Sequence, residues 1–142
     1  MQLKRDTEYA MRIMICIAED LRKNGKKSGV PVSNVISSTG IPKVTFDRIC
    51  GNLEEKGMIR KEITGEGEKY MYPGKGFWKQ SVLSIGEAIE GNMEMFAVFD
   101  RSSCVIQKYG DKLKETQEKL NHVLSEITME SIVENHQKNR RD

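Results

Sequence analysis

The most reactive side chains in this chain belong to three cysteines, Cys16, Cys50 and Cys104, which lie far apart in the sequence. A thiolate can bind a metal ion or be oxidised reversibly. Disulfide frameworks and zinc sites use cysteines that are paired or closely spaced, whereas this odd set contains no C-x-x-C motif. The spacing therefore predicts neither a disulfide framework nor a structural zinc site, and we expect no resident metal or cofactor.

A second group of residues has side chains that suit the recognition of DNA bases. Arg48 can bond bidentately to a guanine edge, and Asp47 can accept a hydrogen bond from a cytosine amino group. The methyl groups of Val44 and Thr45 can contact a thymine methyl group. Base contacts are therefore predicted from Lys43, Val44, Thr45, Asp47 and Arg48. Phosphate contacts, which position a protein without selecting a sequence, are predicted from Lys4, Arg5, Ser33, Arg60, Lys61 and Lys69.

These residues need a scaffold that presents a helix to a major groove, and the segment 32–57 predicts one. A short helical pattern has Ser33 as its expected N-cap and ends at Gly40. A second pattern opens at Pro42 and ends near Gly57. Two short helices joined by a tight turn form a helix-turn-helix. The apolar spacing places Phe46, Ile49, Cys50 and Leu53 on the core side of the second helix.

A β-hairpin is predicted directly after the second helix. Residues 58–63 and 69–72 alternate apolar and polar side chains, and the glycine-containing segment 64–68 lies between them. The helices and the hairpin together predict a winged helix-turn-helix, so double-stranded DNA is the leading partner.

Three further helices are expected over 7–22, 84–91 and about 107–127, the first capped by Asp6 or Thr7. The last is long and polar apart from one apolar seam. A second copy of the chain would cover that seam, which predicts a homodimer; packing against the chain's own core is the alternative. The predicted dimer interface consists of Leu113, Leu120, Leu124 and Ile127.

Cys104 differs from the other two thiols in its expected position. It lies near the start of the long helix, where the helix N-terminus lowers the pKa of a thiol. Cys16 and Cys50 lie on apolar helix faces and are expected to be buried. Cys104 is therefore the sensor candidate, because its oxidation could change dimer geometry and DNA affinity. The alternative is an inert Cys104, with a small-molecule or protein effector acting on the irregular loop around Met93–Phe99.

The composition fits a folded domain of ordinary size. The chain has 142 residues, of which 37% are hydrophobic and 31% charged, and its net charge of +2 does not imply nucleic acid by itself. Residues 1–75 are mildly basic, with 14 Lys and Arg against 10 Asp and Glu. No apolar run approaches the ~20 residues of a membrane span, and no signal peptide is recognisable. We therefore expect a cytoplasmic protein with no membrane partner.

An enzyme would need a nucleophile with its base, a metal constellation or a phosphate-binding loop, and the sequence offers none of these patterns. Gly65-x-Gly67 lies between two strands, which is the wrong context for a phosphate loop. Catalysis is therefore not expected.

With these elements in order, the chain resembles a family of bacterial winged-helix regulators that includes the iron–sulfur regulator IscR, the nitric-oxide sensor NsrR and the cysteine-metabolism repressor CymR. The resemblance covers residues 1 to about 135 and implies a DNA-binding regulator, by family habit a repressor. Four motifs carry it: Leu3 with Tyr9-Ala10-x-Arg12; Gly40-Ile41-Pro42 with Phe46-Asp47-x-Ile49 and Leu53-x-x-x-Gly57-Met58-Ile59; Leu83 to Gly91; and Ile127 to Val133.

The wing departs from this family pattern. Family members carry a basic, glycine-rich tip, whereas the tip here, Ile63 to Tyr70, is one residue longer and acidic. A minor-groove arginine is therefore missing. We expect the wing to contact the DNA backbone weakly, or the operator preference to differ.

The ligand positions depart as well. Cluster-binding members have three cysteines before the long helix; Cys104 matches the last, but Val98 and Asn92 occupy the other two positions. Gln107 stands where the iron–sulfur regulator has a histidine, and Glu8 matches a carboxylate that some relatives recruit from the first helix. One thiolate and one carboxylate fall short of four cluster ligands, so a cluster is the less favoured alternative.

The sequence thus predicts a mainly α fold with a small β-hairpin, a winged helix-turn-helix with a long C-terminal dimerisation helix. The expected units are a DNA-binding domain over 1–80, a linker helix, sensor loop and dimerisation helix over 81–135, and a disordered tail over 136–142. The expected function is that of a homodimeric, sequence-specific transcriptional regulator on a pseudo-palindromic operator. The alternative is a winged-helix protein-interaction module with little specific DNA binding.

Overall fold

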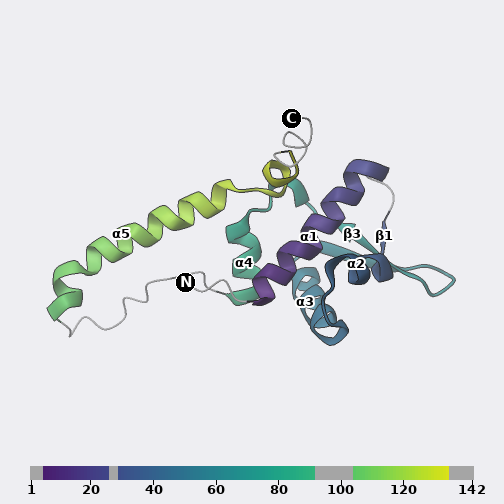
Figure 1. Ribbon diagram of the computed structural model, residues 1–142, viewed down its shortest axis with the longest axis horizontal. Helices are drawn as coiled ribbons and strands as arrows, with labels where there is room; N and C mark the ends of the chain where they lie inside the picture. Colours follow the sequence, from purple (N-terminus) through teal and green to yellow (C-terminus); the bar gives the residue numbers. More distant parts are fainter. Residues whose placement is uncertain (1–4, 26–28, 92–103, 135–142) are drawn as a thin grey trace.

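The computed structural model describes residues 5–25, 29–91 and 104–134, with the backbone alone over 104–107. Most of the described chain is helical, and one small sheet lies beside the helices (Figure 1). The elements are α1 (Arg5–Asn24), β1 (Val30–Pro31), α2 (Val32–Thr39), α3 (Lys43–Glu55), β2 (Ile59–Ile63), β3 (Lys69–Pro73), the 3₁₀ turn η1 (Phe77–Lys79), α4 (Val82–Glu90) and α5 (Cys104–Glu126). The mainly α winged-helix fold predicted from the sequence is confirmed.

Helix α1 forms the centre of the core because its apolar side chains repeat with the helical period. It packs against α2, α3, α4 and β3. Asp6 and Thr7, the predicted caps, instead lie inside the first turn of this helix, which begins at Arg5. Thr7 is buried, and its hydroxyl donates to the Glu90 carboxylate of α4 at 3.1 Å. The core residues of α1 are Ala10, Ile13, Met14, Ile17, Ala18 and Leu21.

The helix-turn-helix forms as predicted, with different caps at its start. The N-cap of α2 is Pro31, which has extended backbone angles, and Ser33 lies exposed in the first turn. The prediction of a Ser33 cap is therefore wrong. Gly40 ends α2 in the left-handed conformation, with a φ of 68°, which glycine adopts without steric cost. Pro42 then caps α3.

The end of α3 leads straight into the wing. The Gly57 amide bonds to the Glu54 carbonyl and the Met58 amide to the Leu53 carbonyl, which together make a Schellman motif. The sheet has the order β1-β3-β2 and is antiparallel throughout. In the wing, Ile59 pairs with Pro73 and Ile63 with Lys69. The hairpin prediction is confirmed, while β1 is an addition that joins the wing to the start of α2.

Helix α4 begins two residues before the predicted Ser84. Ser81 is its N-cap, and Ser81 and Ser84 form a reciprocal capping box. Gly91 ends the helix as predicted. The segment 92–103, which includes the predicted sensor loop, and the tail 136–142 lie outside the described residues.

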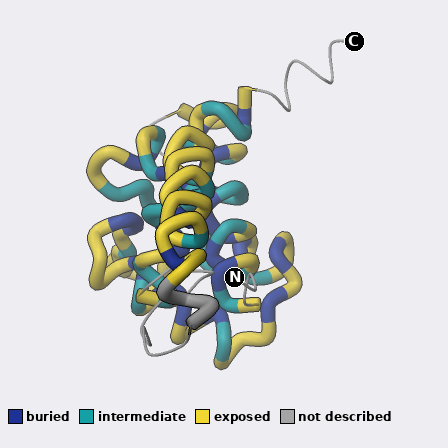
Figure 2. The backbone as a smooth tube through the Cα atoms, turned by 90° about the vertical axis from the view of Figure 1, so that its left-hand side faces the viewer, coloured by how far each residue is buried: buried dark blue, intermediate teal, exposed yellow. Residues whose placement is uncertain are grey.

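Helix α5 extends away from the other helices as a long arm with a mostly exposed surface (Figures 1 and 2). The chain then returns to the core. The Val82 amide bonds to the Ile127 carbonyl at 2.9 Å, and the Met129 amide bonds to the Gln80 carbonyl at 2.9 Å. A short helical stretch over 129–134 follows, whose Met129 and Val133 side chains are buried in the same core as α1.

Candidate nucleic-acid interface

Helix α3 has two different faces, as the periodicity predicts. Phe46, Ile49, Cys50 and Leu53 are fully buried, which confirms the predicted core side. On the opposite side, Val44 is 84% exposed, although burying an apolar side chain of this size would lower the free energy of the folded protein. Of the residues predicted to contact bases, Lys43, Val44, Asp47 and Arg48 are exposed and Thr45 is half-buried.

A groove connects the start of α3 with α2 and the wing. It has a volume of about 540 Å³ and is lined by residues of β1, α2, α3 and β3 and of the wing turn. Ser33 of α2, Lys43 of α3 and Lys69 of β3 all line it, so three of the predicted DNA contacts lie together. The wing residue Glu68 also lines the groove, and its carboxylate accepts a hydrogen bond from the Tyr70 hydroxyl at 2.8 Å.

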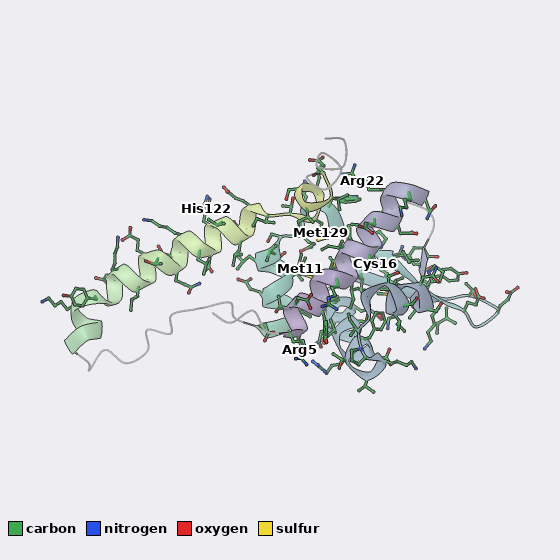
Figure 3. All side chains as sticks on the ribbon, viewed as in Figure 1. Arg5, Met11, Cys16, Arg22, His122 and Met129 are labelled. Carbon is green, nitrogen blue, oxygen red and sulfur yellow. The ribbon has the colours of Figure 1, made fainter. Side chains whose placement is uncertain are left out.

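Arg48 already has a partner within the chain. Its Nη1 donates to Asp6 Oδ2 at 2.8 Å, and its Nη2 donates to Asp6 Oδ1 at 3.1 Å. This is the fork-to-fork geometry in which arginine binds carboxylates most strongly. The hydrogen bonds that Arg48 donates to Asp6, together with the negative charge of that carboxylate, raise the pKa of Arg48 above its usual value. Figure 3 shows the neighbouring Arg5 at the start of α1, on the side of the molecule where α3 lies.

The wing places its basic residues on two sides of β2. Arg60 is exposed, lies over the Tyr72 ring with 5.0 Å to its centroid, and pairs with Glu62. Adjacent residues of a strand point to opposite faces, so Lys61 is directed the other way and is half-buried. Ile63, at the end of β2, is 68% exposed. Arg60 and Lys69 are therefore the exposed basic residues of the wing strands.

Glu8, the carboxylate predicted as a sensor candidate, is paired with Arg12. The Arg12 Nε donates to Glu8 Oε1 at 2.6 Å, and its Nη1 donates to the Thr39 carbonyl at 3.0 Å. The same guanidinium lies over the Tyr9 ring. Arg12 thereby connects the first helix to the end of α2 and holds Glu8 at the surface.

The cysteines occupy three separate settings. Cys50 is buried in the core, and this burial raises its pKa to about 12. Cys16 is half-buried beside Ser38, and desolvation raises its pKa too, so the prediction of a buried Cys16 holds only in part. Cys104 is the first residue of α5.

The position of Cys50 does not suit an iron–sulfur cluster. A cluster needs thiolates that converge, and Cys50 is a neutral thiol inside the hydrophobic core. Among the described residues, no three His, Cys, Asp or Glu side chains come together as a metal site. Cys50 of α3 is therefore not a suitable cluster ligand.

The apolar seam predicted on α5 runs along its surface. Leu113, Leu120 and Leu124 are half-buried, and Ile127 is 38% exposed. Val123, outside the predicted set, is 53% exposed. The dimer interface remains a prediction, which this apolar surface supports.

Sequence reasoning missed Asp6 as a part of this surface. The carboxylate lies 42 residues from its arginine, and a pattern read along one helix contains no signal for such a pair. The opposite charges of Asp6 and Arg48 become informative only when the packing of α1 against α3 is known.

None of the helices in the described part of the chain has the length and apolar character to cross a membrane. No curated protein is similar enough in sequence to count as a match. Among solved structures, the chain is similar to CymR (YrzC), described as the global cysteine regulator of B. subtilis. The identity is 15%, the TM-score 0.75, and the match covers 95% of this chain and 98% of that one.

Two further solved structures have the same fold. The oxidized form of Staphylococcus aureus CymR is 17% identical with a TM-score of 0.69, over 93% of this chain and 95% of that one. T. potens IscR is 12% identical with a TM-score of 0.69, over 96% of this chain and 88% of that one.

A sequence model of a protein family shows to which family the chain belongs. The model for Rrf2, described as an iron-dependent transcriptional regulator, matches residues 3–135. Members of this family are DNA-binding regulators and not enzymes, which confirms both the predicted resemblance and the absence of a catalytic role. The chain belongs to the Rrf2 family of winged-helix transcriptional regulators.

Proposed function

We propose that this regulator is a cytoplasmic homodimeric repressor that binds a pseudo-palindromic operator, with one α3 helix in each of two successive major grooves. The observation that carries this proposal is the exposed face of α3 beside the groove lined by Ser33, Lys43 and Lys69. A recognition helix needs such a face, and the basic groove beside it suits the phosphates that flank a major groove.

The residues assigned to DNA contacts divide into two roles. Lys43 and Arg48 can donate to guanine, Asp47 can accept from cytosine, and the exposed Val44 can contact a thymine methyl group. Thr45, which is half-buried, offers its methyl group at the edge of this face. The phosphate contacts are assigned to Ser33, Arg60, Lys61 and Lys69.

The dimer is assigned to α5. Its seam of Leu113, Leu120, Leu124 and Ile127 repeats at intervals of seven, four and three residues, and these side chains keep exposed area in the single chain. An isologous dimer would bury the same seam from both subunits and would place the two α3 helices symmetrically, as a palindromic operator requires.

The test removes two predicted base contacts together. We expect Lys43→Ala with Arg48→Ala to weaken specific binding by ~2–5 kcal/mol, since each good base contact contributes ~1–3 kcal/mol. The measurement is a binding titration on a duplex recovered from random DNA by repeated selection with the wild-type protein. Lys114→Ala with Lys119→Ala removes the same charge from the exposed surface of α5 and serves as the matched control.

Unchanged affinity in the α3 variant would contradict the assignment of α3. If the wild-type protein selects no duplex at all, the interaction-module alternative becomes the better explanation. The acidic wing turn, with Glu66 and Glu68, is the feature that favours this alternative.

We infer further that regulation acts at the start of α5. Cys104 begins this helix, where the positive end of the helix dipole favours a thiolate, so Cys104 is the candidate for reversible oxidation. A small-molecule or protein effector bound at 93–99 is the alternative signal. A cluster is the less favoured one, because Cys50 lies in the core and cannot contribute a ligand there.

A further inference from the structure

The bidentate pair between Asp6 and Arg48 joins the first helix to the exposed face of α3. Both oxygens of one carboxylate accept from the two Nη atoms of one guanidinium, at 2.8 and 3.1 Å. The pair lies at the surface, with 53% of the Arg48 side chain and 33% of the Asp6 side chain exposed. Solvent-exposed pairs contribute little net stability, so a competing ligand can open this one.

The Asp6 carboxylate is held in position by its neighbour. Thr7 is 1% exposed, and its hydroxyl donates to Glu90 Oε1 at 3.1 Å. Since Glu90 is the last residue of α4, the first turn of α1 is fixed between α3 and α4. The first turn of α1 therefore holds the Asp6 carboxylate in position beside Arg48.

Guanine and a carboxylate present similar acceptors to arginine. The O6 and N7 atoms of guanine accept two hydrogen bonds in a fork, as the two carboxylate oxygens do. Arg48 cannot give both Nη atoms to guanine while they are bonded to Asp6. Any DNA contact of this kind must first displace the Asp6 carboxylate.

We propose that Asp6 is a specificity-determining residue, whose carboxylate competes with DNA for Arg48 and withholds the arginine from sites that lack a guanine at its position. This inference rests on the proposed function, because it assumes that α3 enters the major groove. On DNA without that guanine, Arg48 stays on Asp6 and adds no phosphate contact.

The inference predicts unequal effects of Asp6→Asn on two kinds of DNA. With scrambled DNA, the released Arg48 gains a phosphate contact, so affinity should rise about five- to tenfold near 0.1 M salt. The slope of log K against log salt should steepen by about 0.9, the value for one added phosphate contact. With the selected duplex, Arg48 already leaves Asp6 in the wild type, so affinity should rise only about two- to fivefold.

The experiment compares the full-length protein with two single variants that change the charge equally. Asp6→Asn removes the carboxylate that competes for Arg48. Glu55→Gln also removes one negative charge, at the exposed end of α3, and leaves the pair between Asp6 and Arg48 intact. The probes are the duplex selected by the wild-type protein and the same duplex with its sequence scrambled, each titrated over a range of salt. In an Arg48→Ala background, Asp6→Asn should have no more effect than Glu55→Gln.

The outcomes separate this inference from the function on which it rests. If the wild type selects a duplex but the two variants change both affinities and slopes equally, Asp6 has no role in specificity and the operator-binding proposal stands. If no duplex is selected, both fail together. The inference is supported if Asp6→Asn, but not Glu55→Gln, lowers the ratio of affinity for the selected duplex to affinity for the scrambled duplex. This difference between the two variants should disappear in the Arg48→Ala background.

Discussion

At the scale of single residues, the environment of each thiol decides its chemistry. Burial in the core desolvates the charged form of Cys50 and raises its pKa to about 12, so its thiol stays protonated near neutral pH. Cys16 is half-buried, and desolvation raises its pKa also. Cys104, at the start of α5, is therefore the thiol that we propose for oxidation chemistry near neutral pH.

We therefore expect Cys104→Ser to abolish a peroxide response of DNA binding, if a thiol switch operates. The reason is that the thiolate, not the thiol, reacts with peroxide. The measurement is affinity for the selected duplex before and after peroxide and after reduction. Cys16→Ser is the matched control and should keep the wild-type response; a Cys104→Ser protein that responds like the wild type would refute the switch.

At the scale of elements, local patterns predicted most of the secondary structure but not its contacts. The exposed and buried faces of α3 follow from a period that one helix contains in its own sequence. The helix starts were less predictable, because Pro31 and not Ser33 is the N-cap of α2, and α4 begins two residues before the predicted Ser84. Strand β1 has only two residues, too few for a recognisable alternation, and exists because β3 offers it an edge.

The junction between α3 and the wing depends on one close approach of two backbone segments. A Cβ at Gly74 would lie 2.1 Å from the Gly57 carbonyl oxygen, and backbone cannot move aside as a side chain can. Gly74→Ala should therefore cost about 1–3 kcal/mol of unfolding free energy, measured by chemical denaturation. Gly65→Ala, where no atom lies within 4 Å of the new Cβ, should change stability little. Equal stabilities of the two variants would show that the junction is not constrained.

At the scale of the whole molecule, one core connects the two ends of the described chain. Ile85 of α4, Met129 and Val133, which belong to the predicted segment 81–135, are buried together with α1. The apolar positions of 127–133 were visible in the sequence. Their partner was not, because more than a hundred residues separate Met129 from α1.

Met129→Ala should therefore destabilise the DNA-binding helices and not only the C-terminal end. Truncating a fully buried methionine costs ~2–5 kcal/mol, and the loss should appear as one cooperative transition in both helical signal and Trp78 fluorescence. Glu130→Ala changes an exposed neighbour and should leave the transition in place. Two separate transitions in Met129→Ala would indicate that the C-terminal segment unfolds on its own.

The attachment of α5 at 127–129 has a mechanical consequence. A helix of 23 residues is roughly 34 Å long, so a tilt of 10° at this attachment would displace its far end by about 6 Å. In a dimer joined through α5, each helix would act as a lever arm whose fulcrum is the pair of backbone bonds to Gln80 and Val82. Small angular changes near this fulcrum would alter the distance between the two α3 helices, and with it the half-site spacing that the dimer can bind.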